Sequence, residues 1–137
     1  MQPACVEGSQ GSSLVLSVFE ERLAVCRLDP EAEVPGWVVK RPFCSVTRTP
    51  DELSVVCPEW HVPFETRCER GWRALKLEGS FDLELIGILV SVAAPLAEAG
   101  VSVFAIATYD TDYVLVRESQ LDLARSVLSE RGHVVRR

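Results

Sequence analysis

The sequence predicts an α+β fold on the split βαβ plan of a ferredoxin-like sandwich, in which one antiparallel sheet carries two helices on one face. Two observations in the second half of the chain predict it. Apolar residues there recur with either strand or helix periodicity, and turn or capping residues separate the runs. The resulting order over residues 71–135 is strand, helix, strand, strand, helix, strand. A weaker copy of this order in residues 14–71 is the third observation.

The first strand and helix of the second half are marked by their flanks. Residues 70–78 alternate apolar and polar side chains, which is typical of a strand. The following residues, 83–99, predict a helix with Ser80 or Asp82 as its N-cap and Gly100 after its last turn. This helix is apolar nearly all round, so we expect other parts of the fold to cover most of it.

A hairpin and a second helix complete this half. The β-branched and aromatic runs 101–109 and 113–118 are joined by a short link, which predicts two antiparallel strands. The next helix begins at a pattern resembling a capping box, formed by Ser119 and Asp122, and Gly132 supplies a left-handed C-terminal cap. A short final strand follows Gly132 directly.

The first half follows the same plan with one helix nearly missing. Residues 23–28 predict a strand, and residues 43–48 and 53–57 predict a hairpin around the turn sequence at 49–52. The helix would fall at residues 30–42, where three prolines leave room for about one turn at most. We therefore expect two ferredoxin-like βαββαβ units in tandem, the first of them degenerate.

Domain boundaries follow from this repeat. We expect a flexible N-terminal tail at 1–13, a degenerate unit at 14–71 and a complete unit at 72–135, with strand 72–77 shared between the two units. The tail carries no basic start followed by an apolar stretch, so it does not resemble a secretory signal.

Composition excludes several classes of function. A net charge of −6 without a run of Lys and Arg repels polyanions, so nucleic acid is not an expected partner. The most apolar segment is interrupted by charges and too short to cross a bilayer, so no membrane partner is expected. The five cysteines form no C-x-x-C pair, and we interpret them as reduced packing residues of a cytoplasmic protein.

Catalytic patterns are equally weak. His61 and His133 are the two histidines of the chain, and neither belongs to a set with metal-ligand or triad-like spacing. The sequence holds no phosphate-binding loop and no dinucleotide fingerprint. We therefore expect no enzyme activity, no metal and no cofactor. The three tryptophans are interpreted as packing residues, with a surface patch as the alternative.

Several stretches together resemble a known family. They are DELSVVCPE (51–59), ERGWRALKLEG (69–79) and GILVSVAAPLAEAGVSVFAIATYDTDYVLV (87–116). The chain resembles the small tandem ACT-domain proteins of bacteria over residues 14–135, and the last stretch is also similar to an ACT unit of eukaryotic cytosolic arginine sensors. Ala107 departs from the serine that these relatives usually carry, which removes one hydroxyl from the region.

The resemblance implies a non-catalytic regulatory module that binds a small ligand, typically an amino acid, at an interface between ACT units. The ligand-binding positions carried over by the resemblance are Leu85, Ile86, Gly87, Ile88, Thr108, Tyr109, Asp110, Thr111 and Asp112. Backbone donors at a helix start suit a carboxylate, and the acidic hairpin suits an ammonium or guanidinium group. Exposed sheet edges and the apolar helix favour a homodimer.

Simpler roles remain open for these residues. Aspartates are ordinary turn formers, so Asp110 and Asp112 can serve the hairpin alone. Gly87 can equally mark close packing of its helix. The alternative function is a dimerisation or protein-interaction module that binds no small ligand.

Overall fold

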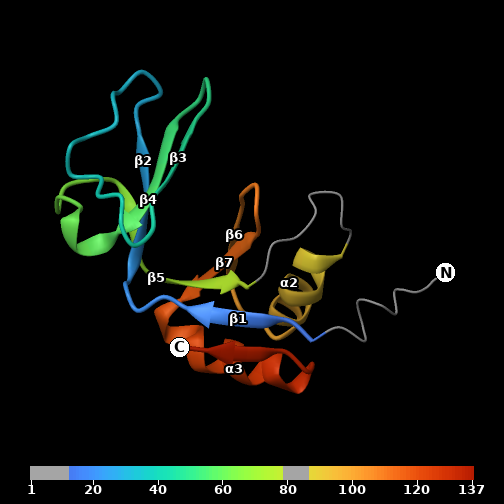
Figure 1. Cartoon of the computed structure of the whole chain (residues 1–137). Helices are drawn as coiled ribbons and strands as arrows, with labels where there is room; N and C mark the ends of the chain where they lie inside the picture. Colours follow the sequence, from blue (N-terminus) through green and yellow to red (C-terminus); the bar gives the residue numbers. More distant parts are fainter. Residues whose placement is uncertain (1–12, 79–86) are drawn as a thin grey trace. The chain divides into compact units, whose positions relative to one another are not determined.

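Two units make up the chain, and each is described on its own. The computed structural model describes residues 13–78 and 87–137. The helical unit takes in residues 1–19 and 74–137, and the strand unit takes in residues 20–73. Figure 1 shows the helices and strands of both.

The sheet of the helical unit combines strands from both ends of the chain. Its strands are β1 (Val15–Val18), the end of β5 (Cys68–Leu77), β6 (Val103–Ala107), β7 (Asp112–Arg117) and β8 (Val134–Arg136). Their order in the sheet is β6-β7-β5-β1-β8. The antiparallel β6–β7 hairpin confirms the predicted pairing, with Val103 opposite Val116 and Ala107 opposite Asp112.

Strand β1 changes the predicted topology. A split βαβ plan puts the last strand beside the first, but β1 lies between β5 and β8. Leu16 faces Leu77 in an antiparallel pair and Val135 in a parallel one. The prediction of a purely antiparallel sheet is therefore wrong, because a strand inserted antiparallel to β5 must run in the same direction as β8. Four residues are too few to show a periodicity, so the sequence did not predict β1.

Helices α2 (Ile88–Glu98) and α3 (Leu121–Glu130) pack on one face of this sheet, as predicted. Buried side chains of both helices join those of the strands in one apolar core. The helical residues of this core are Val92, Leu96, Leu121, Ala124 and Leu128, and the strand residues include Leu16, Leu75, Leu77, Val114 and Val116. Each fully buried Leu or Val is worth about 1.5–3 kcal/mol relative to exposure to water.

Both helices end at the predicted glycines. After α2, Gly100 has a φ of 84° and the Val101 N–H donates to the Leu96 carbonyl at 2.9 Å. After α3, Gly132 has a φ of 89° and the His133 N–H donates to the Leu128 carbonyl at 3.0 Å. These are Schellman caps, which need a left-handed residue that glycine adopts without steric cost.

The start of α2 differs from the prediction. The helix begins at Ile88, because Gly87 takes a left-handed φ of 92° and therefore cannot continue a right-handed helix from residue 83. The predicted caps Ser80 and Asp82 lie outside the described residues.

The start of α3 also differs. A 3-10 turn, η2 (Glu118–Gln120), precedes α3. The N-cap residue of α3 is Gln120, and its side chain makes no capping hydrogen bond. The Gln120 amide instead accepts the Ser102 N–H at 3.0 Å and donates to the Gly100 carbonyl at 3.1 Å. The predicted capping box of Ser119 and Asp122 is therefore wrong, since a tertiary contact from Gln120 fixes this turn.

The strand unit contains β2 (Leu23–Leu28), β3 (Ser45–Arg48), β4 (Leu53–Pro58), the 3-10 turn η1 (Glu59–His61) and the first part of β5. The order is β3-β4-β2-β5, all antiparallel. The predicted strand 23–28 and the hairpin around 49–52 are confirmed. No helix forms in residues 30–42, which agrees with the expectation from their prolines.

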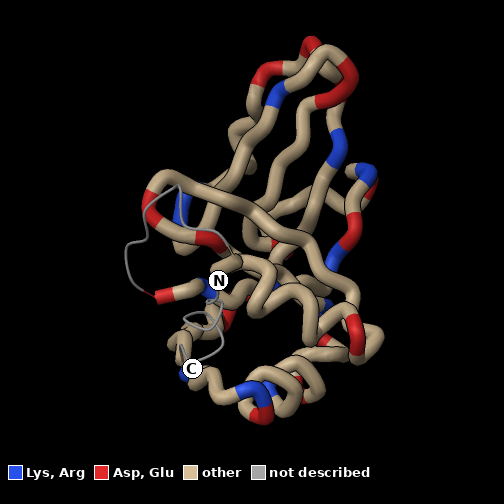
Figure 2. The backbone as a smooth tube through the Cα atoms, turned by 90° about the vertical axis from the view of Figure 1, so that its right-hand side faces the viewer, with Lys and Arg blue, Asp and Glu red and all other residues tan. Residues whose placement is uncertain are grey.

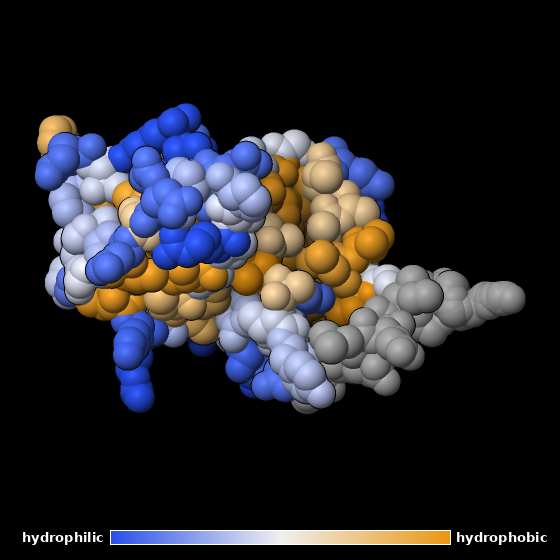
Figure 3. Space-filling view, turned by 90° about the horizontal axis from the view of Figure 1, so that it is seen from above, coloured by the Kyte–Doolittle hydropathy of each residue, from blue (hydrophilic) through white to orange (hydrophobic). Residues whose placement is uncertain are grey.

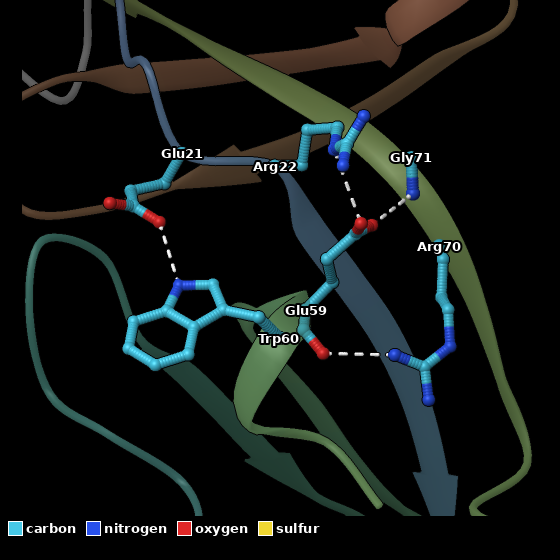
Figure 4. Close-up of polar contacts among 6 residues, drawn as sticks. All are labelled: Glu21, Arg22, Glu59, Trp60, Arg70 and Gly71. Carbon is cyan, nitrogen blue, oxygen red and sulfur yellow. Dashed lines mark hydrogen bonds and ion pairs between the residues drawn. The ribbon is translucent and has the colours of Figure 1, made fainter. Parts of the chain in front are cut away.

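A β-bulge interrupts the pairing of β2 with β5. Leu23 faces Trp72 while Val25 faces Glu69, so β5 carries one extra residue, and Gly71 has a φ of 83°. Figure 4 shows how Glu59 holds this irregularity. Its carboxylate accepts the Gly71 N–H at 2.8 Å and lies 3.2 Å from the Arg22 guanidinium. A backbone donor released by the bulge thus gains a charged acceptor.

The distribution of charged residues and the length of the helices agree with the expectations drawn from the composition. Figure 2 shows the basic positions of the described residues dispersed among acidic ones rather than gathered in one segment. Of the helices in the described ranges, none is long and apolar enough to span a bilayer.

Candidate functional site

The turn between β6 and β7 is held by threonines. The Thr108 N–H donates to the Thr111 carbonyl at 2.9 Å, and the Thr108 hydroxyl donates to the same oxygen at 2.8 Å. The Thr111 N–H in turn donates to the Thr108 hydroxyl oxygen at 3.3 Å. Threonine side chains close turns in this way. Thr108 therefore makes the side-chain hydrogen bonds that close the turn, which was the alternative role considered for Asp110.

Thr111 also fastens the turn to the neighbouring strand. Its side chain is buried, with 6% exposure, and its hydroxyl donates to the Leu77 carbonyl at 2.6 Å. This bond fixes the hairpin tip at the carboxyl end of β5. The hydroxyl of Thr111 is therefore engaged inside the protein, and its predicted ligand contact would have to use other atoms.

The acidic residues of the turn take no part in this bonding. Asp110 is exposed and Asp112 is half-buried at the first position of β7. Within the described residues, neither carboxylate has a hydrogen-bond or ion-pair partner, and Tyr109 between the strands is 82% exposed. Two carboxylates and an aromatic ring therefore stand at the tip, available to a cationic group.

The second half of the predicted site is the start of α2. Gly87 and Ile88 are its N-cap and first residue, and the first turn has neither a side-chain cap nor an acidic residue. The opening N–H groups of any helix lack intrahelical partners and carry the positive end of its dipole. Leu85 and Ile86 lie outside the described residues, as does Glu84.

The backbone at Gly87 gives a conformational reason for the glycine, which is distinct from both ligand approach and close helix packing. A Cβ added at this residue would meet no described atom within 4 Å, so close packing does not explain the glycine. Its left-handed φ does explain it, because L side chains rarely adopt that conformation. In Figure 1 the β6–β7 turn rises above strand β5, and α2 lies beyond the arrowhead of β5, both within the helical unit.

Apolar surface lies near this helix start. Val90, in the first turn of α2, is 63% exposed. Figure 3 shows apolar side chains on the right-hand part of the described surface, the side on which α2 lies in Figure 1. The predicted all-round apolar helix is thus buried on one side by the core and exposed on another.

The histidines and tryptophans have local structural roles. His133 is buried and accepts the Leu14 N–H at its Nδ1, 3.2 Å away. His61 stacks on Trp60 with ring centroids 3.6 Å apart, and Trp60 donates to Glu21 at 3.0 Å (Figure 4). Trp72 is buried, as the packing interpretation expects, whereas Trp60 is 69% exposed. No group of His, Cys, Asp and Glu within the described ranges is arranged to hold a metal ion.

The sequence reasoning missed Glu59 and its partners. Besides the carboxylate contacts, the Glu59 carbonyl accepts from Arg70 at 2.9 Å (Figure 4). Arg70 also donates to the carbonyls of Val62 and Pro63 at 3.2 and 3.1 Å. The one available signal is Gly71 inside a strand pattern, which often marks a bulge. This cluster shapes the strand unit, and Arg22 and Glu59 form an ion pair within it.

Comparisons with known proteins agree with this architecture. The model of the ACT domain family matches residues 67–130, a range that contains every predicted ligand-binding position. A second model, described as an N-terminal domain, matches residues 21–65. The match to the N-terminal domain therefore ends shortly before β5, and the ACT match includes the whole of β5.

Individual relatives extend the likeness. The crystal structure of protein Atu0741 from Agobacterium tumefaciens is 33% identical, with a TM-score of 0.86 over 91% of this chain and 93% of that one. The cytosolic arginine sensor for mTORC1 subunit 1 of Mus musculus is 32% identical over 104 residues, which cover 69% of this chain and 31% of the sensor. Putative protein CASTOR3P of Homo sapiens is 32% identical over 100 residues, covering 64% of this chain and 61% of that protein.

The chain therefore spans less than two thirds of the length of these two curated relatives. The fold, the family model and the relatives converge on one assignment. The chain belongs to the ACT-domain family.

Proposed function

We propose that this protein is a non-catalytic regulatory module that binds an amino acid at an interface between ACT units, which a homodimer would supply. The match to the ACT domain family supports the regulatory role. The similarity to proteins named as cytosolic arginine sensors supports an amino acid as the ligand, arginine first among them, and a cytoplasmic location.

One observation carries the binding proposal. The β6–β7 turn is held by Thr108 and Thr111, so the carboxylates of Asp110 and Asp112 are not needed to form it. An ammonium or guanidinium group can donate charge-assisted hydrogen bonds to both of these carboxylates. The uncapped start of α2 at Gly87 offers N–H donors and a positive dipole end to the α-carboxylate of the same ligand.

The tandem arrangement is part of the proposal, with a degenerate unit at 14–71 and a complete unit at 72–135. The two hairpin turns support it by their shared chemistry. The Thr49 N–H donates to the Glu52 carbonyl at 2.9 Å, as Thr108 does to Thr111. The Thr49 hydroxyl accepts the N–H groups of Asp51 and Glu52 at 3.1 and 3.2 Å. A threonine thus closes both hairpin turns in a similar way, as a tandem repeat would require.

Thermal unfolding with a panel of amino acids tests the binding. A ligand present at about 100 times its Kd stabilises the native state by about 2.7 kcal/mol, which raises the Tm by several degrees. We expect arginine or another member of the panel to give this shift. Asp112→Asn and Asp110→Asn should each reduce it by removing a negative charge.

Asp51→Asn is the matched control, because Asp51 occupies the corresponding place in the Thr49 turn. It should leave the ligand-induced shift unchanged. If no amino acid at millimolar concentration raises the Tm, the sensor function is contradicted. The alternative, a dimerisation or protein-interaction module without a small ligand, would then be favoured. A shift that survives both Asp110→Asn and Asp112→Asn would refute the site. Light scattering with and without the ligand tests the dimer.

A further inference from the structure

Four cysteines of the strand unit form a row across its sheet. Cys26 lies in β2, Cys57 in β4 and Cys68 at the start of β5, while Cys44 comes one residue before β3. All four are free thiols, with Cys26 and Cys57 buried and the other two partly exposed. Cys26, Cys57 and Cys68 share one apolar cluster, so their side chains lie on the same face of the sheet.

The strand register singles out one pair. Cys26 lies directly opposite Cys68 in the antiparallel pairing of β2 with β5. The neighbouring Arg27 N–H donates to the Arg67 carbonyl at 3.0 Å, so Cys26 and Cys68 occupy the adjacent non-hydrogen-bonded position. Residues facing each other there have Cα atoms about 4.5 Å apart, with their side chains close together. That separation lies within the range of about 4.4–6.8 Å that disulfides require.

The competing pair is less favourable. Cys57 faces Ala24, and Cys26 faces Val55, so Cys26 and Cys57 are diagonal neighbours across β2 and β4. Diagonal neighbours have Cα atoms about 7–8 Å apart, beyond the usual disulfide range. The neighbouring Cys57 thiol nevertheless raises the pKa of Cys26, with burial and the Cys68 thiol as further causes, and the Cys26 thiol lowers the pKa of Cys57. By strand register, Cys57 is therefore a less favourable disulfide partner for Cys26 than Cys68 is.

We propose that Cys26 and Cys68 are a modification site, a thiol pair that hydrogen peroxide converts to a cross-strand disulfide between β2 and β5. This proposal does not depend on ligand binding. The strand register already holds the two residues at the required separation, so the sheet need not rearrange. The product would covalently join two strands of the strand unit.

The chemistry balances with one peroxide. The partly exposed Cys68 thiolate attacks a peroxide oxygen, which forms an S–O bond, breaks the O–O bond and releases hydroxide. The Cys26 sulfur then attacks the Cys68 sulfur, which forms the S–S bond and breaks the S–O bond, and the second hydroxide leaves. The two hydroxides take up the two thiol protons. The two sulfurs lose two electrons together, and hydrogen peroxide is reduced to two waters.

The test treats the full-length native chain with hydrogen peroxide and reads thiol count, intact mass and peptide linkage. We expect two thiols lost per chain, a mass lower by two hydrogens, and a linked peptide pair containing Cys26 and Cys68. Dithiothreitol should reverse all three changes. Cys68→Ser should abolish the intramolecular link, whereas the matched control Cys44→Ser should retain it.

Other outcomes overturn the proposal. These are a link between Cys26 and Cys57, oxygen addition to Cys68 without a disulfide, disulfides between chains only, or a Cys26–Cys68 link that forms in urea but not in the native state. If Cys68→Ser fails to fold, mapping of the linkage in the unmodified chain still decides the question.

Discussion

Replacing His133 by phenylalanine tests how the helical unit is held together. The ring is 6% exposed and accepts the Leu14 N–H at Nδ1, so its proton resides on Nε2, which lies 3.3 Å from the Ser91 carbonyl. That carbonyl needs a donor from outside the helix, because Pro95 four residues later has no N–H. His133 therefore joins the segment before β1 to α2 through two hydrogen bonds.

The expected loss follows from these contacts. His133→Phe keeps a ring of similar size but leaves the buried Leu14 N–H without an acceptor, which costs about 1–3 kcal/mol. Loss of the bond to the partly buried Ser91 carbonyl adds about 1 kcal/mol. We expect the free energy of unfolding to fall by about 2–4 kcal/mol. Pro95→Ala supplies Ser91 with a helical donor, so it should reduce the cost of His133→Phe by about 1 kcal/mol.

Urea unfolding of the single and double variants measures these differences, and hydrogen exchange at the Leu14 amide reports the broken bond directly. His61→Phe is the control, because His61 stacks on Trp60 and makes no hydrogen bond within the described residues. It should change stability by less than about 0.5 kcal/mol. If His133→Phe is equally harmless and the Leu14 amide exchanges at its original rate, the bridging role is refuted.

Two further predictions concern a backbone conformation and a carboxylate. Gly71→Ala should cost about 1–2 kcal/mol in urea unfolding because of its left-handed φ of 83°, whereas Gly36→Ala should cost nothing on this account; equal effects would contradict this. A hydrogen bond from Ser17, with Lys76 nearby, lowers the pKa of Glu78 below its ordinary value of 4.5, so its stabilisation is complete above that value and is lost as pH falls through the folded pKa. The advantage of the unmodified chain over Glu78→Gln in unfolding free energy should therefore shrink on acidification from about pH 6 to about pH 3, and a constant difference would contradict it.

Local signals were sufficient for most of the elements. The hairpin turns at 49–52 and 108–111, and the Schellman caps at Gly100 and Gly132, depend on residues within one or two turns of the chain. Such interactions can be predicted from spacing and residue type. The hydrogen bond from the Thr111 hydroxyl to the Leu77 carbonyl could not be predicted in this way, because Leu77 lies on another strand.

The sequence by itself therefore determined the order of strands and helices from β2 onward and the family to which the chain belongs. The tertiary structure decided which strands are neighbours: β1 beside β8, the bulge at Gly71 with its partner Glu59, and Cys26 opposite Cys68. It also decided that α2 begins only after a left-handed Gly87. These features arise from contacts between residues far apart in the chain, and periodicity records only which face of an element is apolar, not which element covers it.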